Sequence, residues 1–411
     1  MSTADEAANE NRPDPDDKRS ADDAGATGSA IAMGAAIAIA ASGVLPAFLT
    51  GALAVQIKAD LAISDTLLGA AVAVLFATAT LIAAVAGRIA DRLGWQRSVR
   101  VVATFAATAL GGVAITGRTY VGLLVFLMVG GVAFAMATPT ANLLLARSVP
   151  TARRGMAFGI NQAAIPLSTL LAGLAVPAVA LTVGWRWSFA IALVLPLIAI
   201  SAASIATPRA AEARPARSPS APFVAPAALR LLAVGGALSA LSIGALHGFA
   251  VVSAVRSGIS EGPAGLLLAV SSLLAISVRV VVGWRIDKVD SDGFTWAVVM
   301  MAVGSAGYAL LAVQSAALVP VGMFLAYGAG WGWPGLFQYA ITQTFHVKPA
   351  SATGITQTGF ASGTALGPIG FGFVADRLGY GWSWSAVVVS SLLAAALTDV
   401  AARRLRATLV T

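Results

Sequence analysis

"GRIADRLGWQR", residues 87–97, is the stretch that decides the fold of this chain. It stands between two long apolar segments, and a shortened copy, "GWRID", occurs at residues 283–287, 196 residues further on. Two other pairs keep nearly the same spacing: "GINQ" at 159–162 with "GITQ" at 354–357, and "GWRWS" at 184–188 with "GWSWS" at 381–385. One spacing shared by three pairs predicts two halves of common architecture.

The composition is that of a membrane protein. Of the 411 residues, 58% are hydrophobic and 11% are charged, whereas soluble domains carry about 25% charged residues. The net charge of +8 does not indicate nucleic-acid binding, because Lys and Arg stand between apolar runs and form no basic patch interleaved with aromatic residues. The partner that the composition predicts is the lipid bilayer.

Twelve apolar segments are long enough, at about 20 residues, to span a bilayer as helices. We expect an all-α membrane protein with twelve transmembrane helices in two pseudo-symmetric six-helix bundles, 29–206 and 226–402, joined by a linker at 207–225. An acidic tail at 1–28 is expected to be disordered, and a short tail follows at 403–411. The expected helices are 29–55, 64–86, 98–116, 119–146, 155–181, 187–206, 226–254, 263–284, 294–313, 316–345, 352–375 and 384–402.

The basic residues predict the orientation in the membrane. Of the 26 Lys and Arg residues, 20 fall on the side of the N-terminus and five on the other side, and Arg279 lies within a helix. Because cytoplasmic loops carry the excess of Lys and Arg, both termini are expected in the cytoplasm. Arginine outnumbers lysine 22 to 4, which favours a bacterial cytoplasmic membrane.

Several function classes are disfavoured by what the sequence lacks. There is no cysteine, and the two histidines, His247 and His346, make a metal centre improbable, so no metal or cofactor is expected. No helix carries an acid–base pair, which argues against a membrane enzyme. The absence of a phosphate-binding loop argues against ATP as the driving force. A membrane sensor would need a signalling domain, which the short tail does not provide. We expect a monomer.

At residues 87–97 the chain resembles the major facilitator superfamily, and the resemblance extends over nearly all of 29–405. The family pattern is glycine, three residues, aspartate, arginine, one residue, glycine, then basic residues, and Gln96 departs from it. In this family the loop latches the outward-facing state, which the resemblance implies for Asp91. A third match, "GFVADRLG" at 372–379, lies on the outer side by the helix count, and we interpret it as a helix end and turn without a latch role. The residues that match are Gly87, Asp91, Arg92, Gly94 and Arg97, with Gly283, Asp287 and Lys288 in the second copy.

Two departures from family patterns narrow the expected function. The helix at 119–146 contains no charge, whereas many proton-coupled members carry an arginine there. The helix at 155–181 lacks the glycine–proline motif of drug–proton antiporters. Export of amphipathic compounds or drugs is therefore the alternative rather than the leading hypothesis.

Arg279 is the strongest candidate for a substrate ligand. It stands in "SVRVVVGWRIDK", 277–288, eight residues or about 12 Å inward from Asp287. A charge at that depth costs about 2.5–3.5 kcal/mol and is expected to face the bundle interior or a water-filled cavity. No helix offers a carboxylate partner, so an anionic ligand is expected, because guanidinium matches carboxylate geometry. Alternatively the side chain snorkels toward Asp287 or a backbone carbonyl.

The spacing of Arg279, Gly283 and Asp287 is similar to that of monocarboxylate and oxalate–formate transporters, in which this arginine holds the substrate carboxylate. The resulting hypothesis is a secondary transporter that moves a small organic anion by alternating access, coupled to a proton or a counter-anion. His247 suits proton exchange or a hydrogen bond to substrate, or is satisfied within its helix. Other polar or aromatic groups either bind substrate or pack between helices: Asn161, Gln162, Gln357 and Trp331.

Overall fold

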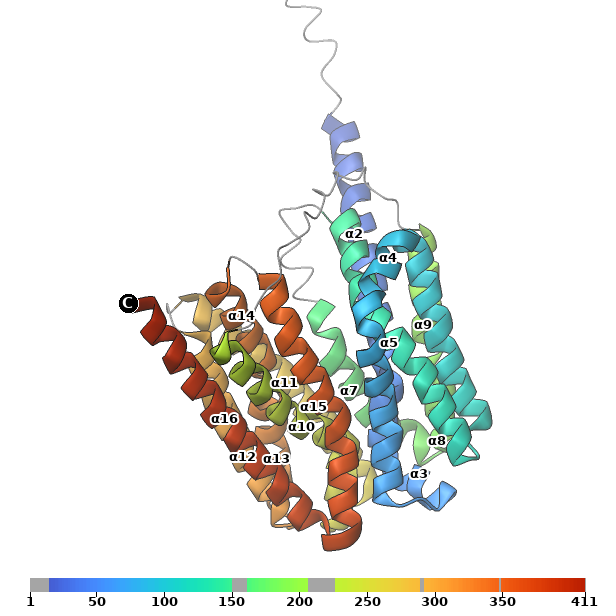
Figure 1. Ribbon diagram of the computed structural model, residues 1–411. Helices are drawn as coiled ribbons and strands as arrows, with labels where there is room; N and C mark the ends of the chain where they lie inside the picture. Colours follow the sequence, from blue (N-terminus) through green and yellow to red (C-terminus); the bar gives the residue numbers. More distant parts are fainter. Residues whose placement is uncertain (1–14, 150–160, 206–225, 289–291, 347–348, 411) are drawn as a thin grey trace, which may run out of the picture.

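The structure is a computed structural model that describes residues 15–149, 161–205, 226–288, 292–346 and 349–410. Every regular element in these ranges is a helix, and the helices form two bundles that lie side by side (Figure 1). The first bundle holds α2 (Pro15–Ala52), α3 (Ala54–Leu61), α4 (Asp65–Thr116), α5 (Tyr120–Ser148), α7 (Ala164–Ala175), η1 (Val176–Ala180), α8 (Trp185–Ala192) and α9 (Val194–Ile205).

The second bundle repeats the plan. Its elements are α10 (Ala227–Arg256), α11 (Glu261–Lys288), α12 (Gly293–Ala312), α13 (Val319–Leu325), η2 (Ala326–Gly330), α14 (Pro334–Thr344), α15 (Pro349–Leu378) and α16 (Tyr380–Val410). Each bundle makes six crossings, because α4 crosses twice while α7 with η1, α8 with α9, and α13 with η2 and α14 each make one. The prediction of twelve transmembrane helices in two six-helix bundles is confirmed.

Three of the twelve crossings would be missed by length and hydropathy alone. Within the described residues, nine helical stretches are by themselves long and apolar enough to cross a membrane. The others are the crossing of α7 and η1, the interrupted crossing of α13 to α14, and α15, which is rich in Gly and Thr. Two of these crossings pack against the other half, α7 against α11 and α15 against α4. Irregular backbone is tolerated at membrane depth where protein shields it from lipid.

Gly94 turns the chain inside the stretch that decides the fold. The sequence predicts a break between helices 64–86 and 98–116, but α4 runs through it, and the one non-helical residue is Gly94, with φ 72° and ψ 165°. Such a positive φ is costly for residues with a Cβ atom, so a glycine stands at the kink. The expected loop is therefore helical on both sides of a single-residue turn.

The helices at both ends of the chain are longer than expected. Helix α2 begins at Pro15 and α16 ends at Val410, so residues 15–28 and 403–410 continue helices where tails were predicted. Extending an existing helix adds a hydrogen bond per residue without the cost of a new nucleus, and proline is well suited to a first helical position. The predicted linker 207–225 and residues 1–14 lie outside the described residues.

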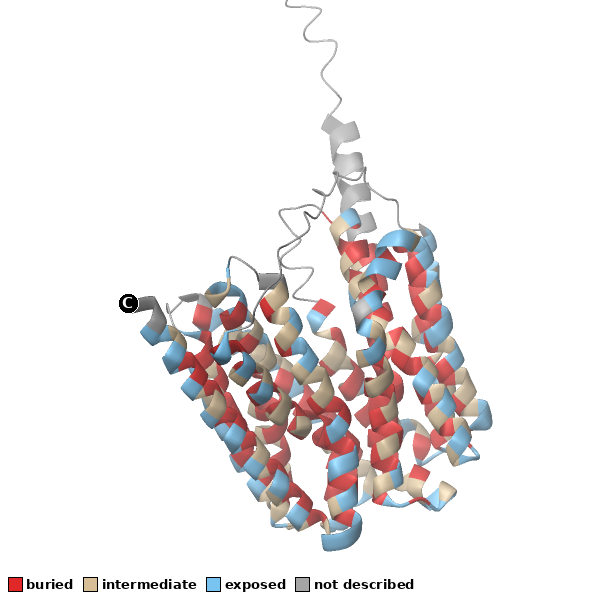
Figure 2. Cartoon of the chain, in the orientation of Figure 1, coloured by how far each residue is buried: buried red, intermediate tan, exposed pale blue. Residues whose placement is uncertain are grey.

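The two halves meet along α2 with α10, α4 with α15, and α7 with α11. Helices α2 and α10 lie at the centre of the molecule, since 78% and 83% of their most apolar stretches are buried inside the protein. Figure 2 shows exposed residues along the outer faces of the peripheral helices, where side chains such as Leu81 and Ile115 are 80% and 76% exposed. Large apolar side chains on the outside fit a lipid environment.

Candidate functional site: a cavity between the two halves

A cavity of about 650 Å³ lies between the halves. Its wall is formed by the start of the α7 crossing in the first half and by α11, the α13–α14 crossing and α15 in the second. The lining extends from Trp331 to Ile286, which lies within one turn of the end of α11 at Lys288. The cavity therefore reaches toward the face where α2 begins and α16 ends, here called the terminal face (Figure 1). Its volume is in the range of small-molecule sites.

The α13–α14 crossing breaks beside this cavity. A π-helical turn at Ala326–Gly330 leads into a turn at 331–333, and α14 then starts at Pro334. Proline has no N–H to donate into the preceding turn, so the break separates the two helices. Irregular turns of this kind expose backbone groups and often occur at functional sites. Here the backbone group that is left without a helical hydrogen bond and is free to accept one from a side chain is the carbonyl of Trp331.

Arg279 reaches this break from α11. Its Nη2 donates a hydrogen bond of 2.6 Å to the carbonyl oxygen of Trp331, and its guanidinium carbon lies 4.4 Å from the centroid of the Trp331 ring. Arg279 meets a backbone carbonyl, as the snorkelling alternative allowed, but this carbonyl belongs to the cavity wall. No ion pair involves Arg279 in the part of the chain that the structure describes.

Two glutamines from the repeated sequences line the same cavity. Gln162 comes from the first half and Gln357 from the second, and both are exposed on the cavity wall. Trp331 also lines it, so with Arg279 four of the predicted ligand residues are brought together. Sequence reasoning did not single out Phe337 and Phe360, which lie on the wall beside Trp333. Phe337 stands three residues after the Gly-Trp-Pro sequence at 332–334, but that pattern alone does not place either ring on the wall.

His247 and Asn161 do not lie on the cavity wall. The His247 ring is buried behind Trp331, with ring centroids 4.4 Å apart, and stacks on Phe48 at 4.5 Å. Its Nδ1 lies 2.8 Å from the carbonyl oxygen of Ile243, so Nδ1 carries the proton and the lone pair lies on Nε2. Asn161 is 3% exposed. The expected direct contact of these two side chains with substrate stays a prediction.

The family motif lies at the terminal face, where the halves are apart. Asp91, Arg92 and Arg97 are exposed, and a Cβ atom built at Gly87 or Gly283 would meet nothing within 4 Å. In this conformation no described helix therefore packs closely against either glycine. Asp287 and Lys288 are the last two residues of α11, and their side chains lie outside what the structure describes.

At the opposite face the halves are joined by Asp376, which lies in the stretch 372–379 that was expected to be a helix end and turn. Asp376 Oδ1 accepts a hydrogen bond of 2.9 Å from the N–H of Asp65. Its Oδ2 accepts bonds from the N–H and the hydroxyl of Thr66, at 2.8 and 2.6 Å. A carboxylate of α15 thus caps the N-terminus of α4, where the helix dipole favours negative charge. Gly372 permits the approach, since a Cβ there would lie 2.2 Å from the Asp65 carbonyl oxygen.

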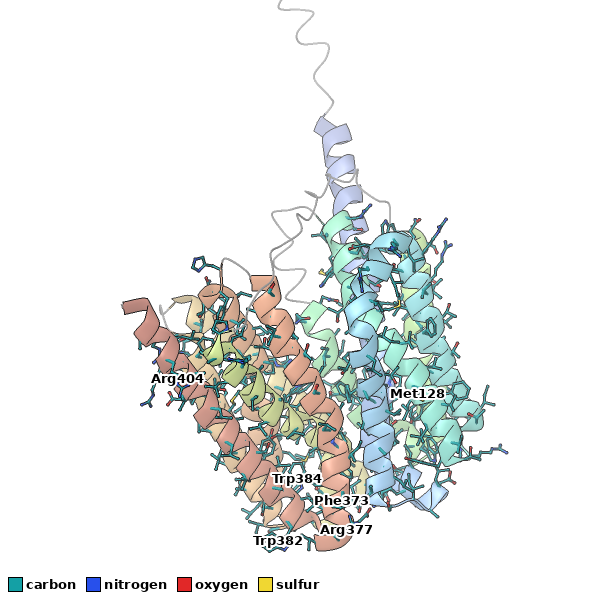
Figure 3. All side chains as sticks on the ribbon, in the orientation of Figure 1. Met128, Phe373, Arg377, Trp382, Trp384 and Arg404 are labelled. Carbon is teal, nitrogen blue, oxygen red and sulfur yellow. The ribbon has the colours of Figure 1, made fainter. Side chains whose placement is uncertain are left out.

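The buried carboxylate of Asp65 adds a second connection between the halves. It accepts hydrogen bonds from the Tyr380 hydroxyl at 2.6 Å and from Arg256 Nη2 at 3.3 Å, both in the second half, and it pairs with Lys58 of the first. Arg377 and Trp382 lie at this face, whereas Arg404 lies toward the terminal face (Figure 3). The contacts of Asp65 and Asp376, here called the opposite-face contacts, close the molecule on the side away from the cavity mouth.

The sequence model of the family described as "Major Facilitator Superfamily" matches residues 29–368. None of the curated proteins compared with this chain matches it. Among solved structures, the chain is similar to a D-xylose–proton symporter, with a TM-score of 0.68, 16% identity, and 90% of this chain and 96% of that chain covered. It is also similar to a bacterial homologue of the human lysosomal transporter Spinster in an inward-facing conformation. There the TM-score is 0.69 and the identity 17%, with 92% of this chain and 97% of that chain covered. For the nucleoside transporter NupG the TM-score is 0.71 and the identity 14%, with 90% of this chain and 98% of that chain covered.

Proposed function

The chain belongs to the Major Facilitator Superfamily and is a secondary transporter, and we propose that it moves a small organic anion of the carboxylate class across the bacterial cytoplasmic membrane. The observation that carries this proposal is the position of Arg279, the one charged side chain on the wall of the cavity among the described residues. The membrane location itself follows from the family and the apolar helices.

The cost of placing Arg279 there supports a ligand role. A charge within the membrane span costs about 2.5–3.5 kcal/mol. The carbonyl and ring of Trp331 offset part of that cost, but they occupy one edge and one face of the guanidinium. A planar guanidinium has five N–H donors, and a carboxylate can accept two of them side by side. Arg279 facing the cavity also favours an anion over the alternative of drug export, which requires no such charge.

The shape of the molecule supports alternating access. The cavity reaches the terminal face, while the opposite-face contacts hold the halves together on the other side. The excess of Lys and Arg on the terminal side supports a cytoplasmic position for that face, and with this orientation the conformation is inward-facing. Rocking one half against the other would expose the cavity to the opposite face, as two-repeat transporters do. The coupling partner is a proton or a counter-anion.

The test is a binding experiment on the purified full chain in detergent. We expect carboxylates to bind and their methyl esters to bind at least tenfold more weakly, because the ester cannot pair with Arg279. Loss of a charge-assisted bond costs about 1.5–3 kcal/mol, so Arg279→Ala should weaken binding by one to two decades. Arg279→Lys keeps the charge without the planar fork and should recover part of the affinity.

The matched control is Arg285→Ala, because Arg285 lies on the same helix, is exposed and is not on the cavity wall. This variant should bind as the wild type does. Equal dissociation constants for wild type, Arg279→Ala and Arg279→Lys, measured by isothermal titration calorimetry on folded protein, would remove the anion assignment.

A further inference from the structure

Building on the proposed transport of an organic anion, we infer that the substrate is a monocarboxylate with an aromatic ring. The structure assigns the carboxylate to Arg279 and the ring to the aromatic residues that follow Trp331 on the wall: Trp333, Phe337 and Phe360. The inference combines the number of charges on the cavity wall with the kind of surface beside Arg279.

The number of charges limits the substrate to a single negative group. In the ranges that the structure describes, Arg279 is the only charged side chain on the wall. The other polar side chains on the wall are neutral, such as Gln162, Gln357 and Thr356. A dicarboxylate would bury its second charge without a partner, which is costly in a partly dehydrated site. An amino acid would bring an ammonium group that no carboxylate on the wall could neutralise.

The wall next to Arg279 contains aromatic rings set edge to face, of which Phe360 is half-buried while Trp333 and Phe337 are 1% and 3% exposed. The ring centroid of Trp333 lies 5.3 Å from that of Phe337 at an interplanar angle of 88°, and 5.9 Å from that of Phe360 at 63°. Aromatic pairs prefer this geometry at centroid separations of 4.5–7 Å, and each pair adds about 0.5–1.5 kcal/mol beyond area burial. A planar ring in the cavity can add to the cluster, while a saturated ring of equal size gains only its burial.

The position of the two tryptophans limits the length of the substrate. Trp331 supports the guanidinium, and Trp333, which starts the aromatic cluster, is two residues further along the turn. Two residues of chain span at most about 7 Å. The backbone positions that carry the charged end and the ring end of the site are therefore close together, which favours a short link between carboxylate and ring.

The experiment compares ligands that differ by one property, on the purified full chain, by isothermal titration calorimetry. The probe is phenylacetate. Cyclohexylacetate has a saturated ring, 2-phenylethanol lacks the charge, and phenylalanine adds an ammonium group. We expect phenylacetate to bind at least fivefold more tightly than cyclohexylacetate and at least tenfold more tightly than the other two. These comparisons use the wild type and do not depend on any variant folding.

A variant then locates the ring. Phe360→Leu should reduce the preference for phenylacetate over cyclohexylacetate to less than twofold, because Phe360 is the half-buried ring of the cluster and Leu keeps the apolar volume. Phe373→Leu is the matched control, since Phe373 lies on the same helix near the opposite face (Figure 3) and should keep the wild-type preference.

The outcomes separate this inference from the transport proposal. Equal affinity for phenylacetate and cyclohexylacetate, both weakened by Arg279→Ala, would overturn the aromatic assignment and leave an organic anion as substrate. Tighter binding of phenylalanine, or a preference that Phe360→Leu leaves intact, would also overturn it. Carboxylate binding that is absent, or that does not depend on Arg279, would overturn the anion proposal and this inference together.

Discussion

His247 is held between aromatic rings directly behind the cavity wall. Phe48 of the first half stacks on one face of its ring, while Trp331 and Tyr327 of the second contact it edge to face. Its Nδ1 bond to the Ile243 carbonyl fixes the ring, and its buried Nε2 has no hydrogen-bond partner in the described ranges. A proton on Nε2 would add positive charge close to Arg279 and strengthen the hold on an anion.

We predict that His247→Gln removes the pH dependence of transport while substrate binding remains measurable. In the wild type, anion uptake should rise as the pH falls, because the protonated imidazole favours the loaded carrier. Radiolabelled uptake into liposomes across a series of pH values measures the profile. His346→Gln provides the control, since the other histidine lies at the end of the α14 crossing, away from the cavity wall. A wild-type profile in His247→Gln would leave counter-anion exchange as the coupling.

The residues that sequence reasoning found are those whose chemistry is conspicuous in an apolar chain. Arg279 is costly anywhere in a membrane, and Gln162 and Gln357 are marked by their place in a repeat, so all three could be predicted to reach the cavity. Phe337 and Phe360 could not, because an aromatic side chain in a membrane helix is equally suited to lipid, to packing and to a ligand. The place of Phe337 on the wall depends on the break after Gly330, and that of Phe360 depends on the packing of α15 against α14. No hydropathy pattern reveals either.

Helix ends, rather than helix interiors, join the halves at the opposite face. The carboxylate of Asp376, near the end of α15, accepts its bonds from the first residues of α4, and Gly379, with φ 90°, then turns the chain into α16. The sequence "GFVADRLG" predicted the helix end correctly. Its contact with the other half could not be predicted, because it depends on which helix of the first bundle starts beside it.

We predict that Asp376→Asn shifts the protein toward the outward-facing state. The amide keeps one oxygen acceptor and loses the charge, so a loss of about 1.5 kcal/mol, or roughly a tenfold change in the ratio of states, is expected. The chain has no cysteine, so a single cysteine at Gln357 in the cavity reports accessibility cleanly. Its labelling by an impermeant reagent from the opposite face should rise.

Asp399→Asn is the control for this shift. Asp399 pairs with Arg403 on its own helix, so neither partner can bias one half against the other. Labelling should stay at the wild-type rate in this variant. An unchanged rate in Asp376→Asn as well would show that the opposite-face contacts do not set the balance between states.

For the whole molecule, the same short motif occurs on both faces of the membrane protein. One copy places Asp91 at the terminal face, where the halves are apart, and the other places Asp376 at the opposite face, where they touch. The twelve crossings and the two halves could be predicted from apolar length and the repeat. The conformation could not, because it is a small difference between two packings of the same helices.

We predict that Asp91→Asn acts in the direction opposite to Asp376→Asn. If Asp91 stabilises the outward-facing state, its loss should raise labelling of the Gln357 cysteine from the terminal face and lower transport, while the amount of folded protein stays near that of the wild type. The double variant should return toward the wild-type ratio, because the two sites lie at opposite ends and distant effects add. An inward/outward ratio that Asp91→Asn leaves unchanged would remove the latch role.

The guanidinium of Arg279 is present whether the cavity is full or empty. The membrane voltage therefore acts differently on the step in which the loaded carrier changes conformation and on the step in which the empty carrier returns. With a monoanion bound and His247 uncharged, the site is neutral, and the loaded carrier should then cross without regard to potential. The empty carrier moves one positive charge, which costs up to about 2.3 kcal/mol for each 100 mV when the cytoplasm is negative. We therefore expect net uptake into liposomes to slow as an inside-negative potassium diffusion potential is imposed, while exchange of labelled for unlabelled substrate keeps its rate. Exchange that slows as much as net uptake would place the moving charge on the loaded carrier instead.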